Sequence, residues 1–192
     1  IDWVVRCNWQ HCEANETACP PMDNTCSTQT HENCEHGHTE TDEITTSSET
    51  FKQMGEYDYN VYAVPVESPT HGDRQVVNSP WLLAPNASPF GWHDTDGDID
   101  PDYYITRGNN VRARDDQNGA DQGGYSPGDT TLDFNYPVDF SKAPKDNMDP
   151  ALTNLFYWNN TMHDFCYLFG FDEVSGNFQE NNYGKGGIGS DY

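Results

Sequence analysis

The sequence predicts an α+β fold, with several antiparallel strands, one long helix, and an irregular disulfide-linked segment before them. Short runs with alternating apolar residues, at 59–66 and 131–140, are typical of half-buried strands. The stretch ALTNLFYWNNTMHDFCYLFGF at 151–171 has apolar residues at helical spacing and is bounded by helix start and stop residues. Five of the six cysteines lie within the first 34 residues, which indicates cross-linking of that end.

The first 55 residues divide into two parts. Residues 1–6, IDWVVR, predict a short strand, whereas 7–55 has almost no hydrophobic periodicity and is rich in Thr, Glu, Asn and Cys. Such a composition buries too little apolar surface to stay ordered without cross-links. Clustered cysteines are typical of extracellular disulfide frameworks, and zinc binding is the alternative, although no CxxC pair occurs. The odd cysteine of this cluster pairs with the sixth, with another chain, or with nothing; the predicted disulfide cysteines are Cys7, Cys12, Cys19, Cys26, Cys34 and Cys166.

The charge balance limits the partners. The chain carries 32 Asp and Glu residues against 9 Lys and Arg residues, a formal charge of -23. A field of this sign repels phosphate backbones and anionic lipid surfaces, and it attracts cations such as calcium. No apolar run of about 18 residues is present, so we expect no membrane span. The absence of an initial Met or a signal peptide suggests a processed product or part of a longer one. The clustered cysteines favour a secreted, extracellular location.

An acidic loop, HDTDGDIDPDYY at 93–104, is the first candidate metal site. Calcium takes roughly six to eight oxygen ligands, and alternate aspartates in a glycine-containing loop can supply them. The loop is no EF-hand, because Ile99 stands where that motif needs glycine and no glutamate closes it. A solvated acidic turn is the alternative. The candidate calcium ligands are Asp94, Asp96, Asp98, Asp100 and Asp102.

A histidine tract, HENCEHGHTE at 31–40, is a second and weaker candidate. His36 and His38, with His31 nearby, could chelate zinc or copper. No spacing of four ligands is complete, and tracts of this kind are often only solvated.

Three tripeptides fit the acceptor pattern for N-glycosylation. They begin at Asn15, Asn86 and Asn159. Asn15 lies in a polar loop and Asn86 in a proline-rich loop, so both remain candidates. Asn159 falls inside the predicted helix, where we expect it to form a hydrogen bond within the fold.

The helix is predicted to begin at Asp149-Pro150 and to end before Gly170. At about 100° per residue, one face is expected to be buried and the opposite face polar. Neighbouring residues on a helix point in different directions, so His163 and Asp164 are not expected to form a dyad. We expect His163 to be a hydrogen-bonded core histidine. The expected buried face holds Leu152, Leu155, Asn159, Met162, His163 and Cys166, and the polar side holds Asn160, Thr161 and Asp164.

A series of motifs between 56 and 192 resembles the fungalysin family of secreted zinc metallopeptidases, which are related to thermolysin. The opening IDWVV is similar to the last strand of that family's propeptide. The resemblance therefore implies a propeptide-like strand at 1–6, a cysteine-rich insertion at 7–55, and the N-terminal, mostly antiparallel β-rich half of a thermolysin-like catalytic domain at 56–192. The motifs are YNVYAVPVESPTHGDR, SPFGWHDTDG, YYITRGNNVRA, LDFNYPVDF and LFYWNNTMHDFCYLFGFDEVSGNFQENNYGKGGIGSDY.

The resemblance implies peptide-bond hydrolysis by zinc-activated water, yet none of the seven histidines belongs to an HExxH motif. We therefore expect the catalytic residues and the bound zinc to lie outside this chain, and we assign no catalytic residue within it. The expected partners are the remainder of the precursor or a partner chain with the helical zinc-binding half, the propeptide, and a protein substrate. The alternative is an inactive extracellular structural or metal-binding glycoprotein that retains the fold.

Overall fold

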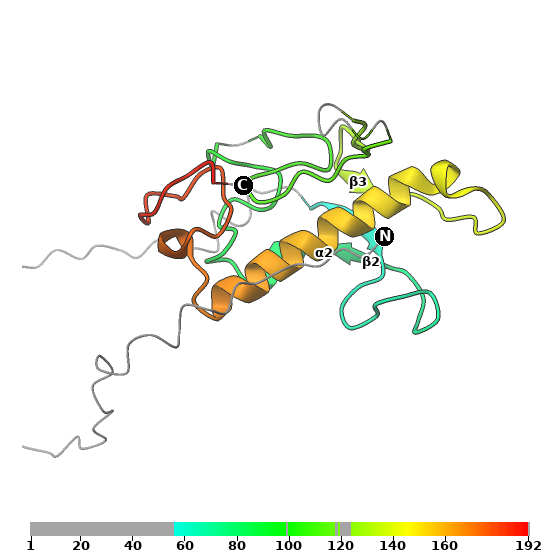
Figure 1. Cartoon of the computed structure of the whole chain (residues 1–192), viewed down its shortest axis with the longest axis horizontal. Coiled ribbons are helices and arrows are strands. Elements are labelled where there is room, and N and C mark those ends of the chain that lie inside the picture. Colours follow the sequence, from blue (N-terminus) through cyan, green and yellow to red (C-terminus); the bar gives the residue numbers. More distant parts are fainter. Residues whose placement is uncertain (1–55, 99, 118, 120–123, 192) are drawn as a thin grey trace, which may run out of the picture. The chain divides into compact units, whose positions relative to one another are not determined.

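The computed structural model describes residues 56–191 except 99, 118 and 120–123. The described part is α+β, as predicted, and Figure 1 shows one long helix beside a small sheet. The segments predicted at 1–6 and 7–55 lie outside the described residues. The predicted segment 56–192 begins where the described residues begin. In chain order the elements are β1 (Asp58–Val61), β2 (Gln75–Asn78), η2 (Pro80–Leu83), β3 (Asp133–Phe134), η3 (Pro144–Asn147), α2 (Met148–Leu168) and η4 (Glu173–Ser175).

The sheet has three strands in the order β2-β1-β3 and is mixed. β1 pairs with β2 in antiparallel orientation, with Tyr59 opposite Val77. β1 pairs with β3 in parallel, with Tyr59 opposite Phe134. The prediction of an antiparallel sheet is therefore wrong for one of the two pairings. Parallel neighbours need a long connection, and the segment between β2 and β3 provides it.

The strand predicted at 59–66 ends at Val61 because the next backbone groups bond to the helix. The amide N–H of Tyr62 donates to Oδ1 of Asn154 at 2.9 Å. The carbonyl oxygen of Tyr62 accepts a hydrogen bond from Nε1 of Trp158 at 2.9 Å. These bonds replace a strand partner and fasten the end of β1 to α2.

Strand β2 was not predicted, because the prolines that follow it suggested an irregular segment. It is four residues long and mostly exposed. The stretch DYYITRGNNVRAR at 102–114 also has the alternation of a strand, but it forms only isolated bridges, which pair Ile105 with Gly128 and Arg107 with Arg112.

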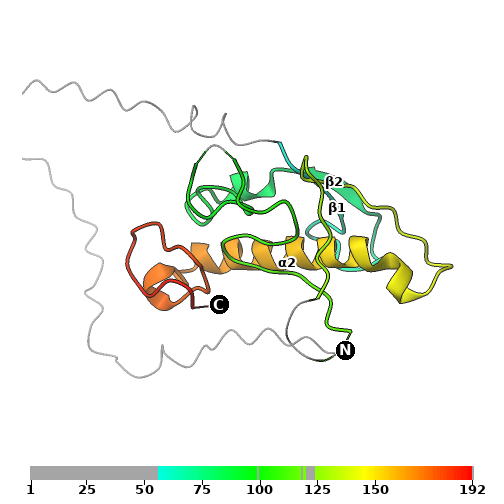
Figure 2. The same ribbon diagram turned by 90° about the horizontal axis from the view of Figure 1, so that it is seen from above.

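Helix α2 runs alongside the sheet (Figure 2). Aromatic rings fill the space between them. Tyr59 stacks on Phe134 with ring centroids 5.4 Å apart. The imidazole of His93 lies in the same stack, 4.8 Å from Phe156 on α2. Aromatic side chains bury large areas per residue, so this small domain gains a substantial core from few residues. The fully buried rings belong to Tyr59, Trp81, Trp92, His93, Phe134 and Phe156.

Helix α2 has nearly the predicted limits. It begins at Met148, and Asp149 lies in its first turn, where a carboxylate stabilises the positive end of the helix dipole. At the other end the N–H of Phe171 bonds to the carbonyl of Cys166 at 3.1 Å, and that of Gly170 to Tyr167 at 3.0 Å. This Schellman pattern requires a left-handed residue at Gly170, whose φ is 91°. The predicted stop is confirmed.

The buried face of α2 is rotated around the helix axis by about 100°, the angle of one residue, from the predicted face. Leu152 is buried as expected, and the side chain of His163 is only 7% exposed. However, Leu155, Asn159 and Met162 are only partly buried. The difference arises because polar residues of this helix have buried hydrogen-bond partners and therefore face inward. The buried residues of α2 are Pro150, Leu152, Thr153, Phe156, Tyr157, Asn160 and Asp164.

No helix in the described part of the chain has the length and apolarity needed to cross a bilayer.

Candidate functional site

The acidic loop is held at its two ends by the core. It begins after Trp92 and His93, both fully buried. The N–H of Tyr103 donates to the carbonyl oxygen of His93 at 3.1 Å and closes the loop. The base of the loop is therefore fixed by aromatic packing, while its tip is exposed.

Three of the five predicted calcium ligands converge in this loop. Asp94, Asp96 and Asp102 each place a carboxylate oxygen within 4.8 Å of the others. Asp98 and Asp100 are not part of this group; Oδ1 of Asp98 accepts the N–H of Asp100 at 2.9 Å in a local turn. The structure thus brings together a smaller ligand set than the alternating sequence suggested.

The carboxylate of Asp94 is the most enclosed of the three. Its Oδ1 accepts the N–H groups of Asp96 and Gly97, both at 2.9 Å. Burial raises the pKa of Asp94, and the nearby charges of Asp102 and Asp96 raise it further, against the lowering effect of the two N–H groups. A bound cation would relieve this repulsion, and oxygen ligands suit a hard cation such as calcium.

The described residues do not form a zinc site. Among them, the carboxylates of Asp94, Asp96 and Asp102 are the only group of three potential ligands, and that group contains no histidine. His93 is enclosed in the aromatic stack, where its Nδ1 donates to the carbonyl oxygen of Arg107 at 3.0 Å. Zinc in enzymes is held largely by histidine together with carboxylate or thiolate, so no catalytic step is assigned to these residues.

His163 and Asp164 are in contact, contrary to the prediction. Nδ1 of His163 lies 3.0 Å from Oδ1 of Asp164, and both side chains are more than nine-tenths buried. The Cα–Cβ bonds of the two neighbouring residues point in different directions, but the ends of the two side chains come into contact. Nε2 of His163 is also buried and has no hydrogen-bond partner among the described residues. A general base must reach the proton that it removes, so this enclosed pair is structural, as expected for His163.

Asp164 is the centre of a buried polar network. Its two oxygens accept hydrogen bonds from Oγ of Ser88 at 2.7 Å and from Nε1 of Trp92 at 2.9 Å. Nδ2 of Asn110 donates to Ser88 at 3.1 Å and to Oδ1 of Asn160 at 3.3 Å. The network therefore links α2 to two loops that are distant in the sequence. The sequence analysis assigned Ser88 and Asn110 no part in such a network.

The turn at 107–110 connects this network to the C-terminal loop. Nδ2 of Asn109 donates to the hydroxyl of Tyr183 at 2.7 Å, and its Oδ1 accepts the N–H of Asn181 at 2.7 Å. A Cβ atom on Gly108 would lie 1.4 Å from the carbonyl oxygen of Trp92, so only glycine fits this position.

Lys185 fastens the glycine-rich C-terminal loop. Its Nζ lies 3.1 Å from Oε1 of Glu173 and donates to the carbonyl oxygen of Asn86 at 2.6 Å. It also lies 5.2 Å above the centre of the Tyr167 ring, within cation–π range. Burial of Lys185 opposes its protonation, but hydrogen bonds to Tyr167 and Glu173 prevail and raise its pKa. The side chain holds the loop against the end of α2.

The remaining predicted site residues have different outcomes. Asn86 is exposed, as an acceptor of glycosylation should be, and its glycosylation stays a prediction. Cys166 is partly buried near the end of α2, and its disulfide stays a prediction because the other cysteines lie outside the described residues. Also outside them are Asn15, His31, His36, His38, Cys7, Cys12, Cys19, Cys26 and Cys34.

The geometry above belongs to a segment with a clear family match. Residues 58–192 match the family model described as fungalysin metallopeptidase (M36). The match includes every described strand and helix, the acidic loop, the polar network and the C-terminal loop.

Fungal proteins of this kind are similar to the chain over the same part. Extracellular metalloproteinase 2 of Trichophyton tonsurans is 44% identical over 137 residues, which are 70% of this chain and 21% of the relative. The protein of the same name from Arthroderma otae is 42% identical over 151 residues, 76% of this chain and 23% of the relative. Extracellular metalloproteinase mep of Aspergillus flavus is 42% identical over 142 residues, which are 72% of this chain and 22% of the relative. The chain thus spans about a fifth of the length of these relatives.

Proposed function

Because this chain belongs to the fungalysin metallopeptidase family, we propose that it is part of a secreted zinc metalloendopeptidase that hydrolyses peptide bonds. Its relatives are named extracellular metalloproteinases, and the chain is accordingly a secreted, extracellular protein. The observation that carries the proposal is the family match over residues 58–192, at 44% identity to a fungal relative.

The proposed contribution of this chain is structural. The zinc ion supplies a water activated for attack on the peptide carbonyl, and its ligands lie in the remainder of the catalytic domain. The residues of this chain hold that framework: the aromatic stack joins the sheet to α2, and the network around Asp164 joins α2 to the loops. Lys185 holds the loop that follows.

The expected partner is the remainder of the precursor, or a second chain, with the helical zinc-binding half. Exposed apolar side chains at the end of α2 and in the chain that follows it support this partner. Large exposed apolar patches are uncommon on isolated domains, and the relatives contain several times more chain than the segment matched here. Phe165 and Phe169 stack at 4.8 Å, and Phe171 lies 5.6 Å from Phe178. The exposed large apolar residues between 165 and 188 are Phe165, Leu168, Phe169, Val174, Phe178 and Ile188. The propeptide and a protein substrate complete the proposed set of partners.

A chimaera tests the proposed function. Residues 58–192 would replace the matching segment of Extracellular metalloproteinase 2 from Trichophyton tonsurans, and casein hydrolysis would be compared with that of the parent. We expect a secreted chimaera whose activity is abolished by 1,10-phenanthroline and restored by zinc. A folded chimaera without activity, beside an active parent, would refute the proposal that this segment serves a peptidase.

A second candidate function is an inactive extracellular glycoprotein that binds calcium. One observation favours it: the carboxylates of Asp94, Asp96 and Asp102 lie close together in the acidic loop. Metal analysis of the purified chain and the chimaera assay separate the two functions. Bound calcium with an inactive, folded chimaera supports the glycoprotein, whereas an active chimaera supports the peptidase whether or not calcium is bound.

A further inference from the structure

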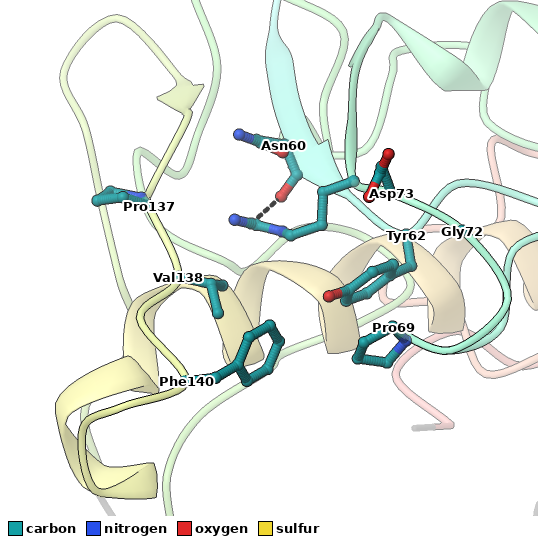
Figure 3. Close-up of a pocket in the computed structure, with 9 residues that line it drawn as sticks. Asn60, Tyr62, Pro69, Gly72, Asp73, Pro137, Val138 and Phe140 are labelled. Carbon is teal, nitrogen blue, oxygen red and sulfur yellow. Dashed lines mark hydrogen bonds between the residues drawn. The ribbon is translucent and has the colours of Figure 1, made fainter.

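A pocket of about 350 Å³ lies at the end of β1, away from the acidic loop. Three segments line it: the end of β1, the loop 69–74 before β2, and the chain 137–140 after β3. Figure 3 shows the rings of Tyr62 and Phe140 on opposite sides of the pocket, with Val138 beside Phe140. The volume is at the lower end of the range for small-ligand sites.

Arg74 provides the positive charge of the pocket. Its guanidinium donates to the carbonyl oxygen of Tyr136 at 2.7 Å and to that of Asn60. A guanidinium has more N–H groups than these two bonds occupy. Among the described residues no carboxylate forms an ion pair with Arg74.

This arrangement is unusual in a chain with a formal charge of -23. Burial lowers the pKa of Arg74, against a raising effect of Tyr62. The carboxylate of Asp73 also lines the pocket, but it is exposed and forms no ion pair with Arg74. A half-buried guanidinium beside open space favours a carboxylate ligand, because its planar fork matches two carboxylate oxygens.

The other residues that line the pocket indicate which side chain the ligand carries beside its carboxylate. The hydroxyl of Tyr62 points into the pocket and offers a second donor (Figure 3). Pro69, Val138 and Phe140 provide apolar surface opposite that donor. The ring of Phe140 is 73% exposed, so a ligand would remove its apolar surface from water.

We propose that this pocket binds the C-terminal residue of a peptide whose last side chain is apolar. The carboxylate lies against Arg74 and the hydroxyl of Tyr62, and the side chain lies against Val138 and Phe140. A C-terminal residue carries the carboxylate and the apolar side chain on the same Cα atom, and its chain continues in one direction only. An internal Asp or Glu carries its carboxylate at the end of its own side chain, so it cannot present a carboxylate and an apolar side chain from one carbon atom. The site is independent of the proposed zinc chemistry.

Fluorescence anisotropy of N-terminally labelled peptides tests this proposal on the full chain. The probe is fluorescein-Ala-Ala-Ala-Phe with a free carboxylate. It is compared with its C-terminal amide and with fluorescein-Ala-Phe-Glu-Ala-amide, which carries an internal carboxylate. A hydrogen bond to a charged group contributes about 1.5–3 kcal/mol, so we expect the amide to bind at least about tenfold more weakly. The internal Glu peptide is expected to bind as weakly as the amide.

Two variants that leave the Arg74 contacts intact locate the site. Tyr62→Phe removes only a hydroxyl, and Phe140→Ala removes an exposed ring; each should weaken binding of the free acid several-fold. Phe169→Ala, whose ring is 75% exposed at the end of α2, is the matched control and should leave binding unchanged. Equal binding of acid and amide, equal binding of the internal Glu peptide, or no effect of both pocket variants would overturn the proposal. Failure of all three peptides to bind would also overturn it.

Discussion

Ser88 donates its hydroxyl hydrogen to Oδ1 of Asp164 at 2.7 Å, although 76 positions separate the two residues in the sequence. Both residues are buried, and the second oxygen of Asp164 accepts a hydrogen bond from Trp92. The carboxylate thus fixes the proline-rich loop after β2 against the last turns of α2. A buried carboxylate persists only where its hydrogen bonds are satisfied, so the two segments depend on each other.

Replacement of Asp164 by Asn should lower the free energy of unfolding. The amide keeps the size of the side chain but presents an N–H₂ group to donors at Ser88 or Trp92, and a buried donor without an acceptor costs about 1–3 kcal/mol. Urea denaturation followed by Trp fluorescence measures the effect. Asp146→Asn, an exposed position in η3, is the control and should change stability by less than about 0.5 kcal/mol. Equal stability of the two variants would contradict a structural role for Asp164.

Replacement of Lys185 by Met should destabilise the chain more than replacement of Lys142. Glu173 has a side chain only 3% exposed and would be left without its cation, whereas the partner of Lys142, Asp139, is 47% exposed. Loss of a buried pair costs about 3–5 kcal/mol; partial exposure of Lys185 reduces this to about 1–3 kcal/mol. Lys142→Met should cost less than about 1 kcal/mol. Glu173→Gln in the Lys185→Met background should restore part of the loss; an equal effect of both lysine variants would exclude the role of Lys185.

The chain should lose stability below pH 6.5 through His93. Burial in the aromatic stack lowers the pKa of this histidine from 6.5 to about 3, so the unfolded chain binds its proton first as the pH falls. Linkage predicts a loss of about 1–2 kcal/mol between pH 6.5 and pH 5. His93→Phe keeps a ring in the stack and should remove this pH dependence, measured by urea denaturation at both pH values. The exposed His71→Gln control should retain it, and an unchanged slope in His93→Phe would refute the assignment.

Calcium should raise the melting temperature through three of the five aspartates of the acidic loop. A ligand that binds only the folded state stabilises it in proportion to the logarithm of its concentration above Kd. Differential scanning fluorimetry with calcium and after EGTA treatment measures the shift. Asp96→Asn and Asp102→Asn should abolish it, whereas the matched variants Asp98→Asn and Asp100→Asn should retain it. An unchanged melting temperature after chelation of the wild-type chain would contradict a calcium site.

Local signals predicted the helix limits well. Asp149-Pro150 and Gly170 bracket α2 within two residues, because caps and stops act through backbone geometry close in the sequence. The buried face was not predictable by apolar spacing alone. Asp164 faces inward because Ser88 and Trp92 supply donors from a distant loop, and no periodicity in the helix records those partners.

The sheet and the acidic loop show the same limit. β1 was predicted by its alternation, but its parallel pairing with β3 depends on the path of the long connection between β2 and β3. The alternating aspartates suggested five equivalent ligands. Asp98 and Asp100 stay outside the group, and Oδ1 of Asp98 instead accepts the N–H of Asp100 in a local turn.

Zinc content is the most direct test of the claim that this chain supplies the framework of a peptidase and no zinc ligand. Inductively coupled plasma mass spectrometry would be applied to the Trichophyton tonsurans parent, to the chimaera with residues 58–192, and to the chimaera carrying His163→Gln. The account predicts the same zinc-to-protein ratio in all three proteins, because no described histidine takes part in a group of metal ligands. A folded chimaera without zinc, or selective loss of zinc from the folded His163→Gln variant, would contradict it.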